Sequence, residues 1–79
     1  MSDDDLTIGH LGIGEQAIVM NVDASHTWRQ RLLDMGFTPG SPLKIIRRAP
    51  FGDPIQVQIR HTHFAIRKAD ARFIKVSRG

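Results

Sequence analysis

The sequence IQVQIRHTHFAIR, residues 55–67, decides the fold class. In residues 55–60 every second side chain is aliphatic and those between are polar, the pattern of a strand with one buried and one solvated face. A second strand is predicted at residues 63–67, with Phe64 and Ile66 facing inward. Two short, alternating strands that follow one another predict an antiparallel, mainly β protein.

The segments on either side extend this pattern. Strands are predicted at residues 16–22 and 43–48 before the central stretch, and at 73–76 after it, where a single helical turn at 69–71 precedes the last strand. Residues 25–35 form the one predicted helix of several turns. This order predicts a small closed or partly open β-barrel of about five strands, with one short helix between strands 1 and 2.

The first strand is predicted to be central, because both of its faces are apolar. We expect Ile18, Met20 and Val22 on one face, and Ala17 and Val19 on the other.

The predicted helix has signals at both ends. Ser25 is a suitable N-cap, and Gly36 can take the positive φ of a C-terminal glycine. Trp28, Leu32 and Met35 recur at helical spacing, so they form one stripe that is predicted to pack on the sheet. After the helix, TPGS at residues 38–41 predicts a type II turn.

Composition limits the chain to one small domain. It has 79 residues and no cysteine, which excludes disulfides and thiolate metal sites. Stability of about 4–10 kcal/mol is expected for this length. We predict a flexible acidic tail at residues 1–5 and a single domain at 6–79. Without residues 1–5 the chain has 11 basic and 5 acidic residues. The resulting net charge of +6 suggests an acidic partner: nucleic acid, a membrane surface or an acidic protein face.

Several classes are not expected. The chain has no apolar run of the ~20 residues that span a bilayer, and no secretory signal. The sequence contains no recognisable nucleophile–base pair and no phosphate-binding lysine motif, so no enzyme and no cofactor are predicted.

The histidines raise a metal hypothesis. His61 and His63 would point to the same side of a strand, but a specific site needs a third ligand. Asp53 and Asp70 are candidates that the sequence does not place, and His26 stands alone. No metal site is predicted, although binding by the His61–His63 pair stays open.

Nucleic-acid binding is an alternative that the basic composition supports. Nucleic-acid sites cluster their cations and interleave exposed aromatic side chains. Here the cations are spread over every predicted element. Only Phe51, Phe64 and Phe73 could serve as platforms, so nucleic acid is not the expected partner.

Four stretches of the chain carry a family resemblance. They are RLLDMGFTPG at residues 31–40, APFGDP at 49–54, AIRKADARFIKV at 65–76, and the opening positions Leu11 and Gly14. In this order and spacing they resemble the FeoA family, the small ferrous iron transport proteins A.

The resemblance implies an SH3-like β-barrel. It also implies a cytosolic accessory protein of bacterial iron uptake, without chemistry of its own, that docks on the membrane transporter FeoB and modulates it and its GTPase domain. Nucleic-acid binding and direct membrane insertion are not implied. Some iron-dependent repressors share the fold, so a small regulatory or RNA-binding barrel is the alternative.

One position departs from the family pattern. The turn between strands 3 and 4 often carries a glycine in FeoA proteins, whereas this chain has RHTH at residues 60–63. Because a two-residue hairpin turn needs a positive φ, a longer or distorted turn is expected here.

We predict a partner-binding surface on the helix and the loop between strands 2 and 3. Its residues are Arg31, Leu32, Leu33 and Met35 on the helix and Phe51 on the loop. Leu33 lies off the apolar stripe, and Phe51 stands at a loop tip between proline and glycine. Leu32 and Met35 also suit the core.

Overall fold

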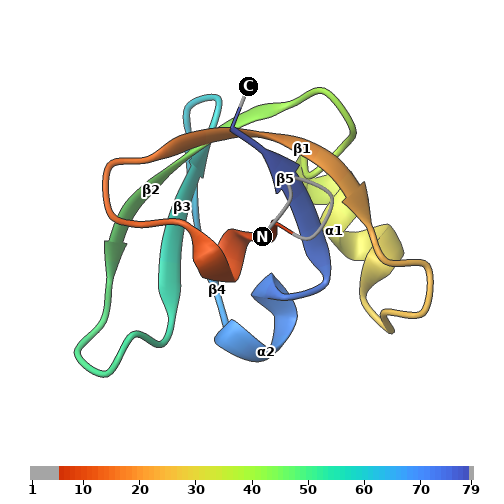
Figure 1. Cartoon of the computed structure of the whole chain (residues 1–79). Helices are drawn as coiled ribbons and strands as arrows, with labels where there is room; N and C mark the ends of the chain where they lie inside the picture. Colours follow the sequence, from red (N-terminus) through yellow and green to blue (C-terminus); the bar gives the residue numbers. More distant parts are fainter. Residues whose placement is uncertain (1–5, 79) are drawn as a thin grey trace.

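A computed structural model describes residues 6–78. The regular elements follow one another as the short 3-10 helix η2 (Ile8–His10), β1 (Gln16–Val22), α1 (Arg29–Met35), β2 (Pro42–Arg48), β3 (Ile55–Ile59), β4 (Thr62–Ile66), α2 (Lys68–Ala71) and β5 (Ile74–Ser77) (Figure 1). The predicted elements are all present, with ends that shift by a few residues. The predicted acidic tail at residues 1–5 lies outside the described residues.

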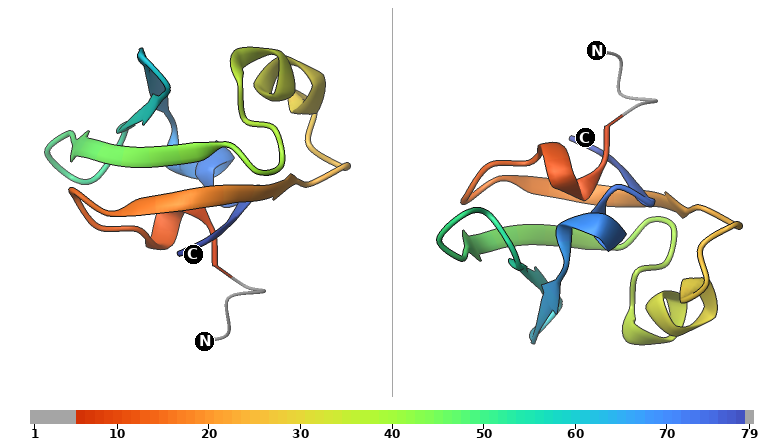
Figure 2. Two further views of the ribbon diagram at one scale, coloured as in Figure 1. Left: turned by 90° about the horizontal axis from the view of Figure 1, so that it is seen from above. Right: turned by 90° about the horizontal axis from the view of Figure 1, so that it is seen from below.

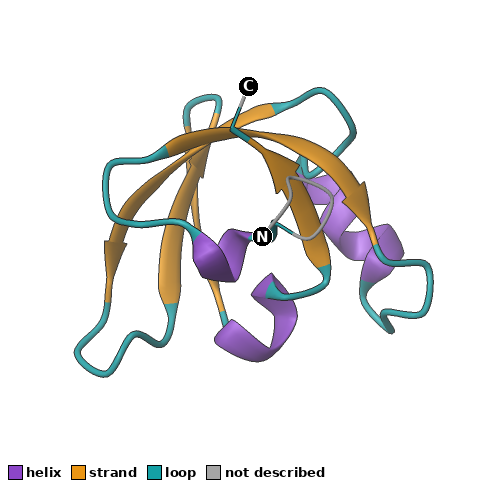
Figure 3. Cartoon of the chain, in the orientation of Figure 1, coloured by secondary structure: helices purple, strands orange, loops and turns teal. Residues whose placement is uncertain are grey.

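The five strands form one antiparallel sheet in the order β4-β3-β2-β1-β5. The sheet curls round, so β4 and β5 are its two edges and β1 is internal, as predicted. Figure 3 shows η2 and α2 at the open side of the curled sheet and α1 outside it. The mainly β class with one helix between the first two strands is therefore confirmed.

A bulge in β1 changes which side chains face inward. The register of β1 against β5 shifts between Val19 and Asn21. An extra residue in a strand reverses the alternation beyond it, so Val22 is buried together with Ala17 and Val19. The prediction that Val22 shares a face with the exposed Met20 is therefore wrong.

The helix α1 begins later than its N-cap signal predicts. The backbone N–H and the hydroxyl of Ser25 both donate to Asp23 Oδ1, at 2.9 and 2.8 Å, which makes a local turn instead of a cap. The helix spans Arg29–Met35 and is followed by Gly36, which has the predicted positive φ, at 118°. Because Trp28 precedes the first helical residue, it does not join the buried stripe, and its side chain is half-exposed.

The core is aliphatic around one aromatic side chain. Phe37, directly after the helix cap, is fully buried, and its ring centroid lies 5.6 Å from that of Phe64. The buried hydrophobic residues are Leu6, Ile8, Leu11, Ala17, Val19, Val22, Leu32, Phe37, Leu43, Ile45, Ile55, Val57, Ile59, Ile66, Ala71, Ile74 and Val76. Burial of this set against the inside of the sheet is the main source of stability.

Two turns decide the register of the sheet. The predicted turn at residues 38–41 is present, with Gly40 at φ 90° and the Ser41 N–H donating to the Thr38 carbonyl. The β3–β4 turn has only two residues, so of the two expected outcomes, a longer or a distorted turn, the longer turn is wrong. Arg60 takes the left-handed conformation at φ 57°. A positive φ is unfavourable for arginine, so this tight turn is distorted, as the other expected outcome states.

Within residues 6–78 none of the helices reaches the length and hydrophobicity of a membrane span.

Candidate functional site

A groove of about 400 Å³ separates α1 from β4 and the start of α2. It combines an apolar floor with a polar and aromatic rim. The side chains that line it are His26, Trp28, Arg31, Leu32, Met35, Ala65, Ile66, Arg67 and Asp70. A concave surface with a few polar groups round an apolar floor is typical of a binding site.

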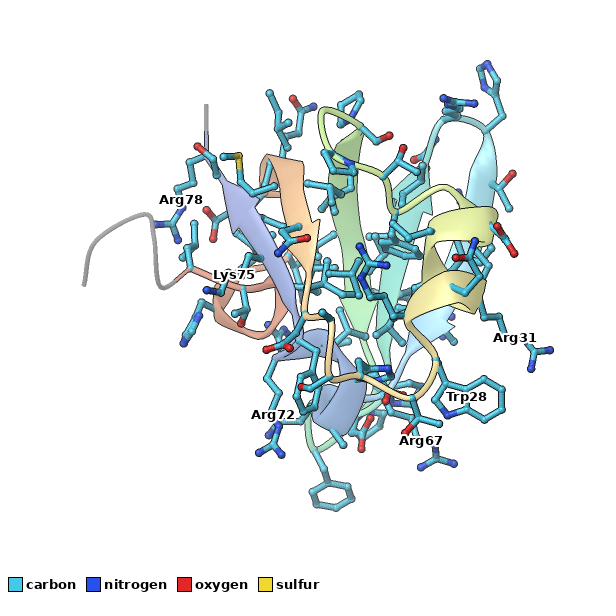
Figure 4. The ribbon with its side chains drawn as sticks, turned by 90° about the vertical axis from the view of Figure 1, so that its right-hand side faces the viewer. Trp28, Arg31, Arg67, Arg72, Lys75 and Arg78 are labelled. Carbon is cyan, nitrogen blue, oxygen red and sulfur yellow. The ribbon has the colours of Figure 1, made fainter. Side chains whose placement is uncertain are left out.

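The rim of the groove carries an aromatic ring and two arginines. The guanidinium carbon of Arg31 lies 5.0 Å from the centre of the Trp28 ring, a cation–π contact. Arg67 is exposed on the β4 side. Figure 4 shows Trp28, Arg31 and Arg67 close together at one corner of the molecule.

A histidine anchors the segment that carries Trp28. The Trp28 backbone N–H donates to His26 Nδ1 at 2.9 Å, so this nitrogen is the acceptor. His26 Nε2 must then carry the proton, which it donates to Asp70 Oδ1 at 2.9 Å. The ring also packs edge-on against Phe73 with centroids 4.8 Å apart. His26 therefore joins the β1–α1 loop to α2 across one end of the fold.

The structure separates the residues that we predicted to bind a partner. Leu32 is 5% exposed and belongs to the core. Leu33 and Met35 are half-buried against the core, and Arg31 is exposed. Phe51 lies on the β2–β3 loop, which Figures 1 and 2 place on the opposite side of the molecule from α1. The five residues therefore do not form one continuous patch, and their binding of a partner stays a prediction.

Six of the residues that line the groove were not predicted to bind a partner: His26, Trp28, Ala65, Ile66, Arg67 and Asp70. The spacing of four residues before Leu32 predicts Trp28 in the core, and nothing in the sequence marks Ala65 or Arg67 as binding residues. The spacing of Arg67 after the alternating strand could have placed it at the end of β4, but nothing in the sequence shows that α1 lies alongside.

Phe51 combines full exposure with a strained backbone. Its φ is 68°, and its side chain makes no buried contact, being as exposed as in an extended peptide. The left-handed conformation costs a non-glycine residue roughly 1–2 kcal/mol, and burial does not offset that cost here.

We expect Phe51→Asn to raise the free energy of unfolding by about 0.5–1 kcal/mol, because asparagine tolerates a positive φ. Urea denaturation of the two proteins measures the difference. Phe51→Ala is the matched control: it removes the ring but keeps the strain, so its stability should equal that of the unchanged protein. A loss of stability in Phe51→Asn would show that the ring has a packing role.

The histidine pair does not extend to a metal site among residues 6–78, where no group of three or more potential ligands lies together. His61 lies in the hairpin turn and only His63 lies in β4, so they do not share a regular strand face. Both carboxylates named as possible ligands have other partners: Asp70 accepts from His26, and Asp53 Oδ1 accepts from the Lys68 backbone N–H at 3.1 Å.

Two carboxylates outside the groove are held in the ionised form. The hydrogen bond from Arg78 lowers the pKa of Glu15, with help from the Gly12 backbone N–H. Hydrogen bonds from the Ser25 backbone and hydroxyl lower the pKa of Asp23. Both shifts come from local structural bonds, and neither group lines the groove.

Comparison with known families decides what kind of protein carries this groove. The sequence model of the FeoA domain matches residues 6–78. The chain belongs to the FeoA family. This family is associated with ferrous iron transport.

A curated relative links the FeoA domain to a transporter. The chain is 31% identical over 71 residues to a fusion of Fe(2+) transport protein A with the Fe(2+) transporter FeoB from Porphyromonas gingivalis. The matched part covers 90% of this chain and 8% of that protein. The chain thus corresponds to the small FeoA part of a much longer polypeptide.

Solved structures of FeoA proteins share the fold. The FeoA protein of Chlorobium tepidum is 36% identical, with a TM-score of 0.83 over 91% of this chain and 69% of its own. FeoA of Stenotrophomonas maltophilia, solved with zinc and described as an SH3 domain protein, is 29% identical, with a TM-score of 0.80 over 91% and 89% of the two chains. The SH3-like fold implied by the family resemblance is therefore confirmed.

Proposed function

We propose that this protein is a cytosolic accessory protein that docks on a FeoB-type ferrous iron transporter and modulates its GTPase domain. The observation that carries the proposal is the fusion of the two proteins in P. gingivalis. Fusion into one chain raises the effective concentration of one part near the other, which favours parts that work in contact.

The groove between α1 and β4 is the docking surface that we assign to this function. Its floor offers apolar area at Met35, and Arg31 and Arg67 supply charge at the rim. A small groove of this kind suits a transient interface that buries less than ~1,200 Å². The rim arginines would mainly raise the association rate and select an acidic partner.

Calorimetric titration of the protein with the cytosolic part of the FeoB-type transporter from the same genome tests the proposal. Saturable binding is expected. Met35→Glu and Arg31→Glu should each weaken it by about tenfold, the equivalent of ~1.4 kcal/mol.

The matched control is Arg47→Glu, which makes the same charge change at an exposed position of β2 that does not line the groove. It should bind like the unchanged protein. Absence of binding by the unchanged protein would refute the docking function. Equal weakening by Arg31→Glu and Arg47→Glu would refute the groove as its site.

A further inference from the structure

The two edge strands of the sheet differ in whether another segment of the chain covers them. The edge of β5 is covered: the Val76 N–H donates to the Leu6 carbonyl at 2.9 Å, and Thr7 bridges to Lys75. The other edge is β4, which pairs with β3 on one side. No backbone hydrogen bond within residues 6–78 occupies its outer side. An uncovered edge is a template on which another chain can add a strand.

The hairpin register shows which groups of β4 point outward. Ile59 and Thr62 flank the two-residue turn and are therefore a hydrogen-bonded pair. Because such pairs alternate along an antiparallel ladder, the N–H and C=O groups of His63 and Ala65 point away from β3. Ala65 also lines the groove. The free backbone groups of Ala65 therefore face the space between β4 and α1.

We propose that this groove binds an extended peptide segment, which adds to β4 as a sixth strand between the sheet and α1. Strand addition provides affinity through backbone hydrogen bonds and specificity through pockets for alternate side chains. We take the natural source of this segment to be the FeoB-type transporter, and that part of the inference rests on the docking function proposed above.

The side chains of the groove define the chemistry of the segment. Leu32, Met35 and Ile66 form an apolar floor that suits an aliphatic side chain. Arg31 and Arg67 at the rim form no ion pair with any acidic residue of the described chain. Alternate side chains of a strand point to opposite sides, so the expected ligand alternates aliphatic and acidic residues.

Selection from a phage-displayed random peptide library tests this inference without assuming a partner. The selected peptides should alternate aliphatic and acidic residues, and each would be synthesised for calorimetry. Ala65→Pro removes the outward N–H, and proline is tolerated where the N–H of an edge strand faces solvent. It should weaken binding at least about tenfold, an energy of ~1.4 kcal/mol. The comparison variant Ala65→Thr keeps the N–H, so it should lose less affinity than Ala65→Pro.

If Ala65→Pro does not fold, a second measurement tests strand addition with the unchanged protein. Peptides methylated at successive backbone nitrogens should lose binding at every second position, because only alternate N–H groups of an added strand point to β4. Equal tolerance at all positions would overturn strand addition, as would unchanged binding by a folded Ala65→Pro protein or failure to select any peptide.

A lipid surface is the other partner that the arginines could attract. Co-sedimentation with phosphatidylglycerol and phosphatidylcholine vesicles measures it. Binding only to the anionic vesicles, abolished by Arg31→Glu with Arg67→Glu and unchanged in Ala65→Pro, would identify an anionic lipid site and overturn the peptide proposal. No sedimentation with either vesicle supports it.

Measurements of transporter binding and of peptide binding distinguish the strand-addition proposal from the docking function. If Ala65→Pro binds the cytosolic part of the transporter as well as the unchanged protein does, strand addition is wrong and docking stands. If selected peptides bind with the expected variant pattern and the transporter does not bind at all, the docking function is wrong and the peptide groove stands.

Discussion

Phe37→Ala should unfold most of the protein near physiological temperature. Phe37 is fully buried, and its ring packs against that of Phe64. Truncation of a buried phenylalanine to alanine costs about 3–5 kcal/mol, which is a large part of the ~4–10 kcal/mol expected for a domain of this length. Circular dichroism during heating should show a Tm lower by at least about 15 °C.

The surroundings of Phe37 explain why the structure cannot collapse into the cavity that Phe37→Ala would leave. It follows Gly36, whose positive φ ends α1 and whose α-carbon faces Ile59 closely: an added Cβ would lie 3.3 Å from Ile59 Cγ2. The helix end thus lies against Ile59 of β3, and the Phe37 ring lies against Phe64 of β4. Phe37→Leu, the control, should lose less because it leaves a smaller cavity. Equal Tm values for Phe37→Ala and the unchanged protein would contradict this description of the core.

His26→Ala should lower the free energy of unfolding by about 2–3 kcal/mol. The ring is buried, donates to the Asp70 carboxylate, accepts from the Trp28 backbone and packs on Phe73. A hydrogen bond to a charged group contributes about 1.5–3 kcal/mol, and the packing adds to it. Urea denaturation at neutral pH measures the loss.

Asp70→Asn is the matched control for His26. The amide oxygen can still accept from His26 Nε2, so the geometry is kept, while the bond loses its charge and about half of its strength. We expect a loss of about 1 kcal/mol. A His26→Ala protein as stable as Asp70→Asn would show that His26 does not join the two segments.

Much of the fold follows from local sequence patterns. Residues 55–59 alternate so regularly that β3 could be predicted with its buried face, and Gly36 and Gly40 marked the end of the helix and the next turn. These features depend on the spacing of apolar residues and on the backbone conformations open to glycine. Both can be seen in a short stretch of sequence.

What could not be predicted depends on contacts between distant segments. The bulge in β1 depends on how β1 pairs with β5. It places Val22 on the opposite face of the strand from the one that the sequence predicts. The bond between His26 and Asp70 joins residues 44 positions apart. The groove likewise exists only because α1 lies beside β4, so the role of Ala65 as an exposed edge residue has no sequence signal.

We propose that the transporter docks at the groove between α1 and β4, and Trp28 allows a direct test. It is the only tryptophan of the chain, lines the groove and is half-exposed. Biosynthetic replacement by 5-fluorotryptophan therefore gives a single ¹⁹F NMR signal, even when an unlabelled partner contains tryptophan. We predict that the cytosolic part of the FeoB-type transporter shifts or broadens this signal in a saturable manner. An unchanged ¹⁹F signal at concentrations where calorimetry detects binding would contradict docking at the groove.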